Sequence, residues 1–317
     1  MKRHFLLLFV VQLLVVGLYG QQDEQYTQFM YNKLAYNPGY AGSANGICLN
    51  AIVRSQWIGL DGAPQTQSLG FHMPLANRRV GIGANIIRNT IGASEDVSLD
   101  GMYAYRAALG SGIIGIGIQG SITFLSADLT GLPTTQPSAI DEAIPMGNQS
   151  KFIPNFGVGA YFNNERFYFG FSVPRLLQNN IDLADSEGII SREVQHFYLM
   201  TGFLIPMGAK VDFQPQLLVK YVDNAPLDAD LNASFIFNDR FITGLTYRLG
   251  GNKENPVGES IDLLLGAQIT DDILFAASYD ITLSDIRDYN SGSIEALLRY
   301  CFGGGDSNSE YTNPRFF

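Results

Sequence analysis

The stretch LDADLNASFIFNDRFITGLTYRL, residues 227–249, alternates between apolar and polar side chains. Every odd position from Leu227 to Phe237 is apolar, and the even positions from Asp228 to Ser234 are polar. The same alternation resumes after a short polar turn. Since two residues is the side-chain period of a β-strand, the stretch predicts a hairpin with one apolar and one polar face. What the apolar face touches, a protein core or lipid, decides the fold.

Similar runs follow one another along the chain, with turn residues between them. We expect strands near residues 47–58, 64–75, 78–90, 95–108, 112–126, 152–162, 166–175, 193–206, 210–223, 226–237, 240–249, 257–269, 272–283 and 292–302. This makes about fourteen strands, an even number, as in bacterial outer-membrane barrels. Apart from the N-terminal segment, no stretch has a convincing helical period.

The length of these runs favours lipid as the neighbour of the apolar face. Many are about 10 to 14 residues long, whereas strands of soluble domains have about 5 to 6. A closed ring of such strands leaves no unpaired backbone groups facing hydrocarbon. The alternative is a soluble sandwich or a lipocalin-like barrel. We therefore predict an all-β fold, a single transmembrane antiparallel up-and-down β-barrel of about 14 strands in the outer membrane.

This barrel makes three groups of side chains interpretable. In each strand, the alternate positions that carry polar side chains (the polar parity) should face the lumen. Charged residues at these positions should form ion pairs there: Asp212, Lys220, Asp228, Asp230, Arg248, Asp262, Asp280, Glu295 and Arg299. Aromatic residues near strand ends should form interfacial girdles: Trp57, Phe71, Phe152, Tyr161, Phe162, Phe167 and Tyr168. Prolines inside the runs predict bulges or strand ends: Pro154, Pro174, Pro206 and Pro215.

The N-terminus has the pattern of an export signal. Lys2 and Arg3 precede an apolar stretch, and Gly20 offers a small residue before an acidic pair. The apolar run is shorter than the roughly 20 residues of a spanning helix, although a retained anchor is the alternative. We expect a signal peptide at residues 1–20, cleaved after Gly20.

The rest of the chain divides into three expected parts. A periplasmic or plug-like leader covers residues 21–46, the transmembrane barrel residues 47–303, and a polar tail residues 304–317. The tail is expected to project into the periplasm to meet a partner. Residues 129–149 carry three prolines without apolar periodicity and predict a long exposed loop.

The charge of the chain argues against nucleic acid as a partner. The formal net charge is −10, and loss of Lys2 and Arg3 with the signal would make it −12. Binding to phosphate backbones needs clustered Lys and Arg, and the sequence has no basic run.

The two cysteines, Cys48 and Cys301, begin the first run and end the last. In a barrel whose first and last strands pair, they would lie side by side at the periplasmic rim. A disulfide there requires Cα atoms within about 7 Å, and two unpaired small hydrophobes are the alternative. Thus a disulfide is possible and the alternative stays open.

Motifs for cofactor, metal or nucleophile chemistry fail on their context. GIGIQG, residues 115–120, matches the dinucleotide pattern but lies within a strand and lacks the helix that would hold pyrophosphate. Its glycines are better explained as sites of close backbone approach or curvature. Ser68 and His72 share a strand face about 13 Å apart, too far for a nucleophile and its base. No metal-ligand spacing occurs. We predict no cofactor, no metal site and no catalytic residues.

The segment QYTQFMYNKLAYNPGYAGSANG, residues 25–46, is rich in tyrosine and contains an Asn37-Pro38-Gly39 turn. Its aromatic hydrogen-bonding side chains could pack into the barrel or against its periplasmic mouth. They could equally form an ordered leader without a functional role.

QFMYNKLAYNPGYAGS (28–43) and RSQWIGLDGAPQTQSLGFHMPL (54–75) resemble the opening of the PorP/SprF family of outer-membrane proteins from the Bacteroidota. Further matches follow in order at residues 156–177, 196–206, 213–248 and 278–286. The Asn-Pro-x-Tyr-Ala-Gly element is Asn37, Pro38, Tyr40, Ala41 and Gly42, and the Arg-x-x-Trp element is Arg54 and Trp57.

The resemblance implies a component of the type IX secretion system that assists export or surface attachment of a partner protein, such as a gliding adhesin used in gliding motility. It implies as partners a secreted or surface-exposed protein with a C-terminal sorting domain, other secretion components including periplasmic lipoproteins, and outer-membrane lipid. It does not imply an enzyme. A pore for small solutes is the alternative function.

For the docking or plugging region we select the leader together with the first hairpin, on the periplasmic side. The same residues could serve only the stability of the fold. The selected residues are Tyr31, Asn32, Asn37, Pro38, Tyr40, Ala41, Gly42, Arg54, Trp57 and Gly59.

Overall fold

A computed structural model describes residues 24–128, 148–183, 191–223, 225–250 and 258–303. Its strands are β1 (Ile47–Ser55), β2 (Gln65–Leu75), β3 (Val80–Ile91), β4 (Ser94–Leu109), β5 (Gly112–Asp128), β6 (Asn148–Asn163), β7 (Phe167–Val173), β8 (His196–Phe203), β9 (Ile205–Pro206), β10 (Val211–Val222), β11 (Asp228–Phe237), β12 (Phe241–Leu249), β13 (Ser260–Gln268), β14 (Ile273–Thr282) and β15 (Ser293–Phe302). The short helical elements are α2 (Lys33–Tyr36), η1 (Pro38–Tyr40) and η2 (Asp285–Tyr289).

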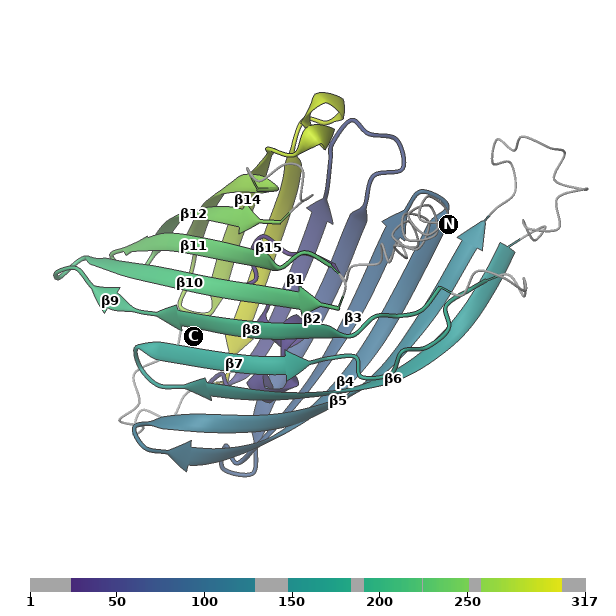
Figure 1. The fold of residues 1–317 in the computed structure, drawn as a ribbon. Coiled ribbons are helices and arrows are strands. Elements are labelled where there is room, and N and C mark those ends of the chain that lie inside the picture. Colours follow the sequence, from purple (N-terminus) through teal and green to yellow (C-terminus); the bar gives the residue numbers. More distant parts are fainter. Residues whose placement is uncertain (1–23, 129–147, 184–190, 224, 251–257, 304–317) are drawn as a thin grey trace, which may run out of the picture.

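The strands form a closed antiparallel ring (Figure 1). Apart from β8 and β9, each strand pairs with the next in sequence, and β1 pairs with β15 along its whole length. The two-residue strand β9 continues β8, and both pair with β10, so the fifteen assigned strands make a ring of fourteen. The predicted barrel and its strand number are confirmed.

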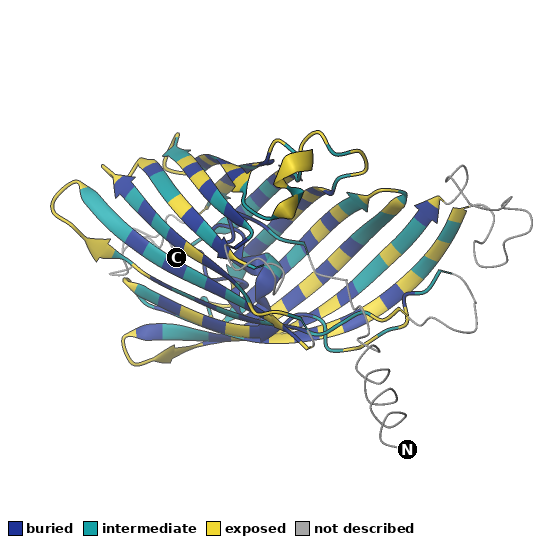
Figure 2. Ribbon diagram, turned by 45° about the horizontal axis from the view of Figure 1, so that its top comes forward, coloured by how far each residue is buried: buried dark blue, intermediate teal, exposed yellow. Residues whose placement is uncertain are grey.

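The period of two decides which side chains face the lumen and which face outward (Figure 2). In β11 and β12, Leu231 and Leu245 are exposed on the outer face, while Asp230 and Arg248 are buried inside. The same parity places apolar side chains outward on the other strands, and the charged residues assigned to the lumen follow the inward parity. The outer face is therefore an apolar belt. Among the described residues, no helix combines the length and apolarity needed to cross a membrane.

Two of the four prolines depart from the prediction. Pro206 ends β9 and Pro174 directly follows β7, as expected. Pro154 and Pro215, however, lie inside β6 and β10 in unbroken register with one neighbour each. On the other side of Pro154, pairing with β7 ends at Val158. On the other side of Pro215, pairing is interrupted between β8 and β9. In both places the missing N–H faces no strand partner, so the cost that normally excludes proline is avoided.

The aromatic girdle needs one correction. Phe152 is exposed on the outer face, but Tyr161 and Tyr168 are fully buried and point into the lumen. Both tyrosines follow the inward parity of their strands, and parity rather than proximity to a strand end decides the face that a side chain occupies.

The two ends of the barrel differ. We call the end where β1 begins and β15 ends the seam end, and the opposite end, which carries the β1–β2 loop, the loop end. At the seam end Cys48 lies opposite Cys301, and a disulfide joins them with a Cα–Cα distance of 4.1 Å. The expected signal peptide, tail and most of the 129–149 loop lie outside the described residues.

Candidate functional site: the leader in the lumen

Residues 26–44 of the leader are almost entirely buried inside the ring (Figure 1). The segment begins in the loop-end half, where the side-chain amide of Gln25 donates to Asp228 at the start of β11. It leaves at the seam end, where Gly42 lies against β2 and β3 and its carbonyl accepts from Arg106. Within it, Asn37 begins the 3₁₀ turn η1 by accepting from the backbone N–H of Gly39 at 2.8 Å. The leader thus occupies the lumen from one half to the other.

One side of the lumen, which we call the charged wall, is built by β1 and β10–β15. Arg54 pairs with Asp280 at 2.8 Å and with Glu295 at 3.2 Å. Arg248 pairs with Asp230 at 2.8 Å, and Lys220 pairs with Asp228 and Asp230, each at 3.0 Å. Asp262 lies 3.8 Å from Arg248 and joins the same network. These groups face inward near the loop end, where three bases meet five acids.

The leader supplies hydrogen-bond donors to this acidic excess. The backbone N–H groups of Thr27 and Gln28 each donate to the Glu295 carboxylate at 2.9 Å. The Thr27 hydroxyl donates to Asp280 at 2.7 Å and accepts from Arg54, also at 2.7 Å. Bonds to ionised groups in a buried site are among the stronger hydrogen bonds of proteins. Residues 25–28 therefore complete the charge network of the wall.

The opposite side, which we call the glycine wall, is built by β3 and β5–β7. Backbone of the leader lies directly on inward-facing glycines there, and a Cβ at Gly117 would overlap the backbone of Pro38 and Gly39. A Cβ at Gly81 would overlap the carbonyl of Ala41. Only glycine permits such an approach between two backbones. Of the glycines in GIGIQG, Gly115 and Gly117 serve the close backbone approach that was one of the two predicted roles, whereas a Cβ at Gly120 would have no atom near it.

Polar and aromatic groups complete the seat of η1. The side-chain amide of Asn37 donates to the carbonyl of Ala160 at 2.9 Å. The rings of Tyr40 and Tyr161 meet edge to face with centroids 5.1 Å apart. The ammonium of Lys33 lies 4.1 Å from the centroid of the Tyr168 ring. Burial, with a smaller contribution from the charge of Arg299, lowers the pKa of Lys33 well below its usual value.

The structure brings together most, but not all, of the residues selected from the sequence. Tyr31, Asn32, Asn37, Pro38, Tyr40, Ala41, Gly42 and Arg54 are all buried in the lumen. Trp57 and Gly59 instead lie on the β1–β2 loop at the loop end, so a single docking region at the seam end does not contain them. The reason is topological, because β1 runs away from the seam end and its outgoing loop must lie at the other end.

Sequence reasoning did not select Thr27, Gln28, Gly81 or Gly117 for the site. One signal was present for the first two, since an acidic excess on the inward parity requires donors from elsewhere. The glycines carried a weaker signal, namely repeated glycine on one parity of a strand.

The residues that the sequence raised for metal or nucleophile chemistry can be placed in the lumen. Within the described part of the chain, no group of three His, Cys, Asp or Glu side chains is placed to hold a metal ion. Ser68 and His72 both face the lumen on β2, and the His72 ring packs 5.0 Å from that of Tyr40. The site binds a segment of its own chain.

Comparison with known proteins gives a family and a fold. A family model described as "Type IX secretion system membrane protein PorP/SprF" matches residues 18–300. No curated protein matches the chain.

Among solved structures, the "CymD monoaromatic hydrocarbon channel" is 11% identical, with 87% of this chain and 93% of that chain covered and a TM-score of 0.50. CdiB from Acinetobacter baumannii is 9% identical over 81% of this chain, which spans 60% of the length of CdiB, with a TM-score of 0.38. A mutant Rh. blastica porin is 10% identical, with 81% of this chain and 100% of that chain covered and a TM-score of 0.33. At 11% identity the likeness to the CymD channel shows the fold alone.

Proposed function

The chain belongs to the type IX secretion system membrane protein family PorP/SprF, and from that premise we propose that its barrel assists the export or surface attachment of a partner protein. The proposed partner carries a C-terminal sorting domain, as a gliding adhesin would. The proposed location is the outer membrane, reached through a cleaved signal peptide, with other secretion components, including periplasmic lipoproteins, at the seam end.

The observation that carries this proposal is the occupied lumen. The leader is held by ion-pair groups on one side and by close backbone contact on the other, over residues 25–42. A barrel filled in this way offers rims and loops for recognition rather than a passage. In this proposal the leader keeps the membrane sealed, and partner binding takes place at the two ends of the barrel.

The alternative function, a pore for small solutes, is favoured by the charged side chains of the lumen. Conductance in planar bilayers separates the two functions. We expect the purified protein to give no steady conductance above the lipid background. A steady, ion-selective conductance of the intact chain would favour the pore.

The test of the secretion role is deletion of the gene in its native host. Surface proteins with a C-terminal sorting domain are then quantified by mass spectrometry of shaved cells. We expect one or a few of them to disappear from the surface and to return when the wild-type gene is restored. Unchanged surface levels of all of them would contradict the proposal.

A further inference from the structure

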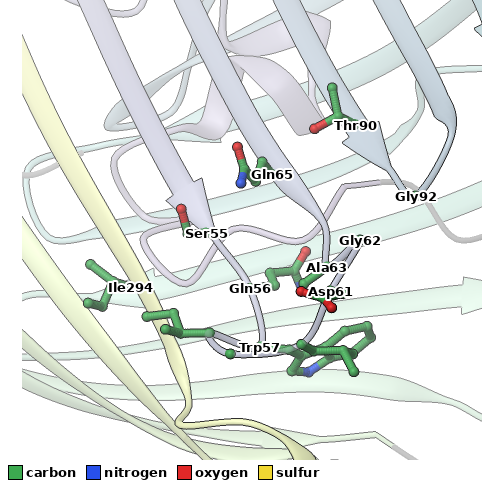
Figure 3. Close-up of a pocket in the computed structure, with 13 residues that line it drawn as sticks. Ser55, Gln56, Trp57, Asp61, Gly62, Ala63, Gln65, Thr90, Gly92 and Ile294 are labelled. Carbon is green, nitrogen blue, oxygen red and sulfur yellow. The ribbon is translucent and has the colours of Figure 1, made fainter.

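The outer face of the barrel carries a groove at the loop end, of about 690 Å³. Its floor is one cross-strand row, because the register places Ile294 opposite Ser55, Ser55 opposite Gln65, and Gln65 opposite Thr90. All four residues have the outward parity of their strands, so the groove lies on the outside of the barrel and not in the lumen. Figure 3 shows Ser55, Gln65 and Thr90 near their strand ends, with Trp57 on the loop beside them.

The wall of the groove is the β1–β2 loop, which is held in place on both sides. The N–H of Ile58 donates to the carbonyl of Gly292 at 2.8 Å, and the N–H of Ser291 donates back to the carbonyl of Ile58 at 2.7 Å. On the other side, the N–H of Gly92 donates to the carbonyl of Gly62 at 2.9 Å. The groove is therefore part of the fold rather than a gap beside a loose loop.

The groove begins where the apolar belt ends. Val53, Leu69 and Ile86, all about half exposed, lie on the outer face nearer the seam end. Val53, Gln67 and Arg88 form one cross-strand row on the outer face. The row that floors the groove is the next outward-facing row toward the loop end. A polar row just beyond an apolar belt is the level at which lipid head groups lie in a membrane barrel. Whatever occupies the groove is thus continuous with the lipid along the belt.

The side chains of the groove fit a neutral, hydroxyl-rich group. Its donors and acceptors are the amide of Gln65 and the hydroxyls of Ser55 and Thr90, with the indole N–H and apolar ring of Trp57 beside them. Among the described residues that line the groove, the charged one is acidic, Asp61, and none is Lys or Arg. A phosphate group would therefore meet no positive charge there.

We propose that this groove binds the neutral sugar head group of a membrane glycolipid, with the acyl chains lying along the belt below it. The sugar hydroxyls bond to Gln65, Thr90 and Ser55, and Trp57 covers one face of the ring. This proposal rests on the membrane placement contained in the proposed function, but it does not depend on the identity of the secreted partner.

The test uses the fluorescence of Trp57, which is the single tryptophan of the chain. The full protein is reconstituted in vesicles of phosphatidylethanolamine and phosphatidylglycerol, with increasing fractions of digalactosyl diacylglycerol. We expect a saturable change in Trp57 emission with the glycolipid fraction, reversed by free galactose in excess. Gln65→Ala and Thr90→Ala should each weaken the apparent affinity about 5- to 10-fold, the loss of one hydrogen bond. Tyr221→Ala, an outward aromatic on the opposite side of the barrel, is the control and should change nothing.

Three outcomes would overturn the inference. If the emission of Trp57 changes as much on reconstitution into vesicles without glycolipid as into vesicles with it, Trp57 is an ordinary interfacial anchor. A change that follows the protein-to-lipid ratio would make the groove a contact between copies of the chain. No change with glycolipid would exclude sugar binding. Each of these leaves the secretion role intact, whereas a chain that does not reconstitute into vesicles at all would contradict the membrane placement instead.

Discussion

The charged wall and the glycine wall hold the same segment by opposite means. On the charged wall, long side chains reach inward and bind defined donors of residues 25–28. On the glycine wall, the inward-facing glycines carry no side chain, so the backbone of residues 38–42 lies directly against the backbone of the strands. The first wall thus specifies which chemical groups the leader must carry, and the second specifies mainly the path that its backbone follows.

The difference predicts different responses to substitution, and the largest effect is expected at Arg54. Its guanidinium is buried between Asp280, Glu295 and the Thr27 hydroxyl. Arg54→Met would leave two buried carboxylates without their base, which costs about 3 to 5 kcal/mol. Urea unfolding of the detergent-solubilised barrel, followed by circular dichroism, measures this loss.

The matched control is Arg88→Met. Arg88 pairs with Glu95 at 2.8 Å on the outer face, where both side chains are more than two-fifths exposed. Exposed pairs contribute little, so this variant should unfold almost as the wild type does. Equal stability of the Arg54 and Arg88 variants would show that the charged wall does not hold the barrel together.

The second prediction separates the seam from both walls. Replacing Cys48 and Cys301 by Ala removes a link between residues 253 positions apart. Because such a link restricts the unfolded chain, we expect a loss of about 2 to 4 kcal/mol, again by urea unfolding. The leader should stay protected from trypsin at Lys33, since neither wall changes. Before any substitution, two reactive thiols in the unreduced, denatured protein would show that the disulfide does not form.

The third prediction addresses the glycine wall. Gly117→Ala adds a methyl group where the backbone of Pro38 and Gly39 lies, and overpacking of this kind costs about 1 to 3 kcal/mol. The leader can relieve the overlap only by moving, so trypsin should cleave at Lys33 faster than in the wild type. Gly120→Ala on the same strand faces outward with no atom nearby and is the control. Equal protection in both variants would contradict close packing of the leader on this wall.

Much of the barrel could be predicted because a period of two fixes the face of every strand residue. The alternation alone predicts that Asp230, Asp280 and Glu295 face the lumen, and all three are buried there. Their partners could not be predicted in the same way. Thr27 meets Asp280 and Glu295 only because the ring closes around the leader, and no local pattern encodes a contact across 253 or 268 positions. The placement of Trp57 could not be predicted for a related reason. Strand β1 ends between Arg54 and Trp57, so Arg54 points into the lumen whereas Trp57 lies on the loop beside the outer groove.

The smallest effect is expected from Lys33, which lies between the walls. Its pKa in the docked leader is lowered well below the usual value, chiefly by burial, whereas in an undocked, hydrated leader it would be about 10.4. The docked state therefore binds fewer protons, and docking should strengthen as the pH rises toward that value and weaken as it falls through the lowered pKa. The Tyr168 ring, 4.1 Å from the ammonium, favours the charged form and opposes this trend, which keeps the effect small.

Maleimide labelling of an Ala35→Cys variant at pH 7 and pH 9 measures undocking, and the same variant with Lys33→Met corrects for titration of the thiol. After this correction, we expect the labelling of the introduced thiol to be slower at pH 9 than at pH 7. Faster corrected labelling would mean that Lys33 is held as a cation by the aromatic rings and that its charge, rather than its burial, fixes the leader between the two walls.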